Sequence, residues 1–74
     1  MMDAQEQARL LSLAGEYVAL VEAMRSGNYA DDTEWRLLSS ERTLVHDDLL
    51  QLTGMTRADD MYVFCRNLLS DQRS

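Results

Sequence analysis

A chain of 74 residues with a formal net charge of −6 is long enough for one small domain and carries the wrong sign of charge for neutralising phosphates. Its single cysteine excludes a disulfide within the chain, and its single histidine leaves too few ligands for a cysteine or histidine metal cage. A lone domain of this size buries only about 60% of its unfolded surface. We therefore expect it to pair with a second copy or a partner protein.

The first predicted helix runs from Asp3 to Arg25, because apolar residues recur along it at spacings of three and four. This seam consists of Leu10, Ala14, Tyr17, Val21 and Met24. Other apolar residues beside the seam widen the apolar face to about half of the helix circumference. We expect that one neighbouring helix cannot cover so wide an arc.

A line of small residues also follows this helix: Ala4, Ala8, Ser12, Gly15, Ala19 and Ala23. Small side chains allow a second backbone to approach closely, and Gly15 costs about 1 kcal/mol relative to alanine in a helix interior. The alternative interpretation is that alanine is simply a good helix former. The wide apolar arc and the small residues together predict a homodimer, with its interface at Ala8, Leu11, Gly15, Val18, Ala19 and Glu22.

The stretch SGNYADD separates the first helix from a second, which we expect from Asp32 to Thr53. Gly27 suits the left-handed position that follows a helix end. Asp31 and Glu34, three residues apart, resemble a capping box. The seam of this helix is again spaced by three and four residues and comprises Trp35, Leu38, Arg42, Val45, Leu49 and Leu52.

Gly54 ends the second helix, and a third is expected from Thr56 to Ser70. Thr56 is predicted to cap this helix, with Asp59 supplying negative charge to its first turn. The sequence therefore predicts an all-α, three-helix domain over residues 1–74. Its two long helices are antiparallel, and the whole is expected to be dimeric.

The segment 47–69 has the outline of a helix-turn-helix, in which the second helix presents polar or basic side chains to the DNA major groove. Here that helix exposes Asp59 and Asp60, with Arg57 and Arg66 as the basic residues nearby. Carboxylates are repelled by phosphates unless cations outnumber them. We expect no direct contact with nucleic acid.

Neither His46 nor Cys65 is expected to catalyse a reaction. A general base needs an orienting partner and a substrate pocket, for which a chain of this size has little room. Cys65 lies on the apolar face of the third helix, where a small buried side chain is the usual role of a free cysteine. We expect no enzyme activity and no cofactor.

Arg42 is the most informative polar residue, because it interrupts the apolar seam of the second helix. A charge in such a place is costly unless a carboxylate pairs with it, and Glu16 or Glu22 could do so within the chain or across a dimer. Such a residue can set the register of helix pairing. The alternative is that its side chain extends to water at the edge of the seam.

A protein-binding site is predicted at Tyr29, Asp31, Asp32 and Trp35, together with Arg42. Aromatic residues and arginine dominate binding hot spots, and neighbouring carboxylates suit a basic partner surface. The alternative is a capped helix start whose Trp35 enters the core. The acidic pairs along the chain could mimic phosphates or could simply be solvated.

These features favour a small, acidic, non-catalytic regulator that binds a larger protein as an antagonist, anti-activator, inhibitor or adaptor. A transcription factor or a nuclease complex would suit as the partner. The alternatives are a divergent helix-turn-helix DNA-binding regulator and a structural helical dimer. The polar start MMDAQEQARL is unlike a signal peptide, and no apolar run approaches about 20 residues. We therefore expect a cytoplasmic protein that does not bind membranes.

Overall fold

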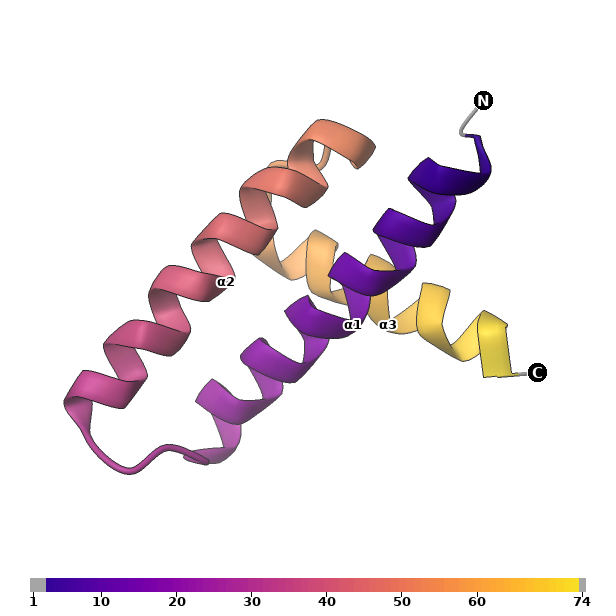
Figure 1. Cartoon of the computed structure of the whole chain (residues 1–74). Helices are drawn as coiled ribbons and strands as arrows, with labels where there is room; N and C mark the ends of the chain where they lie inside the picture. The colour runs from indigo at the N-terminus through magenta and orange to yellow at the C-terminus, as the bar shows by residue number, and fades with distance from the viewer. Residues whose placement is uncertain (1–2, 74) are drawn as a thin grey trace.

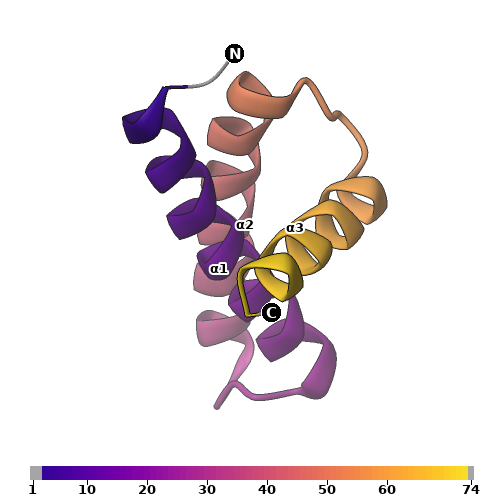
Figure 2. The same ribbon diagram turned by 90° about the vertical axis from the view of Figure 1, so that its right-hand side faces the viewer.

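The computed structural model describes residues 3–73, with side chains described as far as residue 71, and consists of three helices (Figure 1). These are α1 (Ala4–Ser26), α2 (Asp32–Thr53) and α3 (Ala58–Arg73). Helices α1 and α2 form an antiparallel pair, and α3 crosses α1 obliquely (Figures 1 and 2). The predicted all-α, three-helix architecture is confirmed over the described range.

Local hydrogen bonds define the ends of the first two helices as the sequence predicted. The Asp31 carboxylate accepts a hydrogen bond from the Glu34 amide at 2.9 Å, and the Glu34 carboxylate accepts one from the Ala30 amide at 3.2 Å. This reciprocal arrangement is a capping box, which satisfies amides that have no partner inside the helix. Gly27 and Gly54 follow α1 and α2 with φ angles of 73° and 75°, where glycine avoids the strain of a side chain.

The predicted cap of α3 is wrong. The helix begins at Ala58, two residues after Thr56, and the Met61 amide donates to the Arg57 carbonyl at 3.0 Å. The threonine that organises this turn is Thr53 instead, whose hydroxyl accepts from the Met55 amide at 3.2 Å. Because Thr53 already satisfies the turn from the end of α2, residues 54–57 can run without helical structure before α3 starts.

The core lies where α1 passes between α2 and α3. Its buried side chains are Leu10, Ala14, Tyr17, Val21, Leu49, Met61 and Cys65. Four of them come from α1, so this helix is the centre of the fold, and α3 packs mainly against it. The Tyr17 ring is fully buried, and its hydroxyl donates to the Ala58 carbonyl at 3.5 Å.

Trp35 departs from its predicted place in the α2 seam. Its side chain remains 40% exposed, whereas Leu49 in the same seam is fully buried. The difference follows from the position of α3, which crosses the middle of α1 and lies away from the start of α2 (Figure 1). The interpretation of Trp35 as a core residue is therefore wrong.

Candidate protein-binding site

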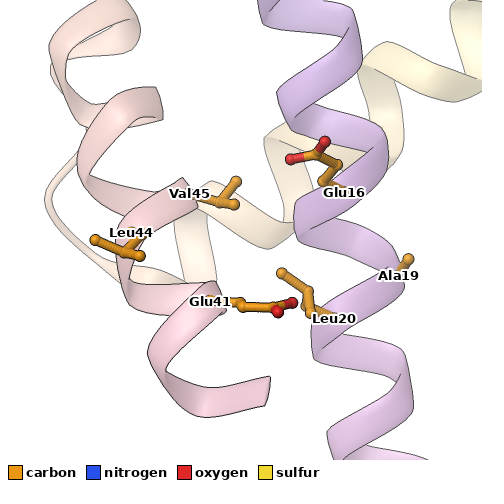
Figure 3. A pocket seen from close by; sticks show the side chains of 6 residues that line it. All are labelled: Glu16, Ala19, Leu20, Glu41, Leu44 and Val45. Atoms are coloured by element: carbon orange, nitrogen blue, oxygen red, sulfur yellow. The ribbon is translucent and has the colours of Figure 1, made fainter. Parts of the chain in front are cut away.

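An open groove of about 440 Å³ runs between α1 and α2 on the face turned away from α3 (Figure 3). Three residues of each helix line it: Glu16, Ala19 and Leu20 from α1, and Glu41, Leu44 and Val45 from α2. Four of the six are apolar. The groove exists because the core-facing residues of both helices point towards α3, which covers the opposite face of the pair and not this one.

The two glutamates of the groove come from opposite walls. Figure 3 shows Glu41 reaching from α2 towards Leu20, while Glu16 lies near Val45 about one turn further along. Both glutamates are exposed, and neither has an ion-pair partner or a hydrogen-bond partner within the part of the chain that the structure describes. The groove therefore combines apolar walls with two carboxylates that are free to accept hydrogen bonds.

Large apolar side chains extend this surface along α2. Leu44 is 66% exposed and Leu37 is 60% exposed. Together with Glu41 they are spaced by four and three residues, which places all three on one face of the helix. This spacing is readable in the sequence, but the predicted protein-binding site did not include it.

The predicted protein-binding residues occupy two separate places. Asp31, Asp32 and Trp35 lie together where α2 begins, beside the half-buried Tyr29. Part of the acidic character there is already used, since the Asp31 carboxylate caps α2. Arg42 lies about two turns further along α2 and is not part of this cluster.

Arg42 is half-buried, but the predicted ion pair within the chain is wrong. It lines a crevice with Tyr17 and Ala58, close to the start of α3. Its proposed partners are elsewhere, because Glu16 lines the groove on the other side of the α1–α2 pair and Glu22 accepts a hydrogen bond from α3. An ion pair across a dimer stays a prediction.

Helix α3 covers part of the arc that was assigned to a dimer. Val18 packs against the core, and the Glu22 carboxylate accepts a hydrogen bond from the Tyr62 hydroxyl at 3.1 Å. Leu11, on the same side of α1, is half-buried. Two neighbours, and not one, therefore share the apolar arc of α1, which removes the argument that a second copy is needed to cover it.

The line of small residues remains open. Ala8 and Ala19 are exposed, and a Cβ atom placed on Gly15 would meet no other atom within 4 Å. Nothing in the part of the chain that the structure describes therefore requires glycine at this position.

His46 is half-buried beside the core, and Cys65 lies within the core. The ring of His46 lies 5.9 Å from that of Tyr17, and its Nε2 atom is buried without a hydrogen-bond partner. Cys65 is fully buried, and this burial raises the pKa of its thiol from 9.0 to about 11. Such a thiol is protonated and poorly nucleophilic at neutral pH.

The first turn of α3 is acidic and exposed, as Asp59 and Asp60 show. Two of the basic side chains near this helix stack on Tyr62. The Arg25 guanidinium lies 4.6 Å from the centre of the Tyr62 ring, and that of Arg66 lies 6.0 Å from it. This arrangement differs from a recognition helix, which needs its cations directed towards phosphates.

Comparison with known proteins adds no relative, because no protein family, curated protein or solved structure matches the chain.

Within residues 3–73, no helix is both long and apolar enough to cross a lipid bilayer. No group of three or more histidine, cysteine, aspartate or glutamate residues in the same range could hold a metal ion.

Proposed function

We propose that this protein is a small acidic regulator that binds a larger protein and covers part of its surface. The observation that carries the proposal is the α1–α2 groove, whose apolar walls are open and whose two carboxylates have no partner among the side chains of residues 3–71. Exposed apolar surface of this kind is typical of protein-binding sites. The net charge of −6 favours a basic partner surface.

The size of the chain suits masking of a partner. A stable interface buries about 800 Å² on each side. The described surface of the chain is 5238 Å², so one such interface would occupy about a sixth of it. Such a contact would cover a similar area of the partner's surface. Nucleic-acid-binding faces of a transcription factor or nuclease complex have the basic character that such a regulator requires.

The test is site-specific capture in the cell that produces the protein. A photoreactive amino acid replaces Leu44 at the groove or, as a control, Asn67 on the exposed face of α3. We expect a defined partner to be captured from position 44 and not from position 67. Capture of the same proteins from both positions, or of none from position 44, would reject this function.

A homodimer along the line of small residues on α1 is part of the proposal. The exposed Ala8 and the free space around Gly15 support it, because small residues permit close approach of a second helix. Sedimentation over a concentration series measures the mass, with Gly15→Leu as the disruptive variant and Gly15→Ala as its control. The monomer mass of 8.5 kDa at tens of micromolar protein, or a dimer unchanged by Gly15→Leu, would reject this arrangement.

A further inference from the structure

We infer that the α1–α2 groove receives an amphipathic helix of a basic partner, with an arginine of that helix held between Glu16 and Glu41. This inference rests on the proposed function and specifies the chemistry of the partner. It follows from the order of apolar and acidic groups along the groove.

The apolar part of the groove suits the side chains of a helix. Leu20 and Val45 are half-buried and form its floor, while Leu44 stands at its edge with most of its surface in water. A helix laid along such a groove inserts apolar residues spaced by three and four positions. Because the groove is open along its length, the helix need not be enclosed, and its far face can stay in solvent.

The two carboxylates select a cation on that helix. Glu16 and Glu41 lie on opposite walls and each stands beside an apolar residue of the other helix (Figure 3). A planar guanidinium has five N–H donors and can bond to both carboxylates while its flat faces contact apolar side chains. A lysine ammonium satisfies the charge but has no flat apolar face. The groove therefore favours arginine over lysine, and either over a neutral residue.

Charge also argues against a second copy as the occupant. Two copies that met through this face would bring four groove glutamates into one interface, and each copy carries a net charge of −6. Two of the chain's arginines are already engaged within it, since Arg9 pairs with Asp48 at 3.8 Å and Arg25 stacks on Tyr62. A chain of opposite charge fits where a copy of this one does not.

The test uses three synthetic helical peptides with the same leucine face and with arginine, lysine or glutamine at the central position. Binding to the full chain is measured by fluorescence anisotropy. We expect the arginine peptide to bind on the order of tenfold more tightly than the glutamine peptide, because charge-assisted hydrogen bonds add to the apolar contact. The lysine peptide should fall between them. Absence of binding by all three, or equal binding of the arginine and glutamine peptides, would overturn the inference.

A matched pair of double variants separates the groove from the general negative charge. Glu16→Gln with Glu41→Gln should abolish the preference for arginine. Asp59→Asn with Asp60→Asn removes the same charge from α3 and should leave the preference intact. An equal loss in both variants would show that the overall charge, and not the groove, attracts the peptide.

Two further measurements show where the peptide binds and whether a second copy already occupies the groove. Amide signals of residues 16–20 and 41–45 should shift on binding in nuclear magnetic resonance spectra. If a second copy already occupies the groove, Leu44→Glu will lower the sedimenting mass of the free protein, and the inference is rejected. Capture of a partner from position 44 without any arginine preference would leave the proposed function standing and reject the basic helix.

Discussion

Replacing Leu49 or Leu44 with alanine should show which face of α2 forms the core. Leu49 is fully buried against α1 and α3, whereas Leu44, five residues earlier on the same helix, is 66% exposed. The two substitutions remove the same side-chain atoms from the same helix, and they change its helix propensity by the same amount. Any difference between them therefore reports the packing around each side chain.

The expected difference is large compared with the stability of the domain. Truncation of a fully buried leucine costs about 2–5 kcal/mol, from lost burial and from the cavity that remains. Leu44 keeps only about a third of its surface away from water, so its truncation should cost about 1 kcal/mol or less. A domain of this length is stable by roughly 4–11 kcal/mol. Leu49→Ala should therefore remove a substantial part of that stability.

Urea denaturation followed by circular dichroism at low micromolar concentration measures both variants. A lower midpoint for Leu49→Ala with an unchanged slope would show loss of packing without a change in the unfolded chain. Equal destabilisation by the two variants would refute the reasoning, because it would mean that Leu44 is also buried in solution. In that case the groove would not be open.

Other predictions test the helix ends, the buried thiol and the acidic surface. Asp31→Ala should cost about 1 kcal/mol through loss of the cap, whereas Asp32→Ala should cost less, and thermal melts compare them. Gly54→Ala should destabilise by about 1 kcal/mol because its φ is positive, while Gly15→Ala should stabilise by up to about 1 kcal/mol because the added methyl group meets open space. Because burial raises the pKa of Cys65 from 9.0 to about 11, the unfolded chain loses this proton first as the pH rises. The contribution of this thiol to the free energy of unfolding is therefore complete below about pH 9 and is lost between about pH 9 and pH 11. As the pH rises from about 8 to 10, the free energy of unfolding should fall less in Cys65→Ala than in the wild type. Gel shift at physiological salt should detect no complex with double-stranded DNA, and a retained, salt-sensitive complex would restore the helix-turn-helix alternative.

The α1–α2 groove lies elsewhere on the molecule than the protein-binding site that was predicted from the sequence. Sequence reasoning selected the aromatic and acidic start of α2, which the structure leaves exposed, with Trp35 at its surface. The groove lies further along the helix and takes Glu16 and Glu41 from two segments that are 25 residues apart. Those two glutamates are unremarkable in either helix alone. They become a candidate site because the packing of α1 against α2 sets them on opposite walls of one groove.

The sequence by itself determined the number of helices, most of their ends and the side of α1 that enters the core. These features depend on short-range physics, namely the 3.6-residue period, the side-chain caps and the glycines that adopt positive φ. Only the tertiary structure decided that α3 lies across α1, that Trp35 stays at the surface and that Arg42 lines a different crevice from Glu16. Periodicity shows which side of a helix is apolar, but not which neighbour covers each part of that side. That choice depends on how side chains from distant segments interlock, and here it left the α1–α2 groove uncovered.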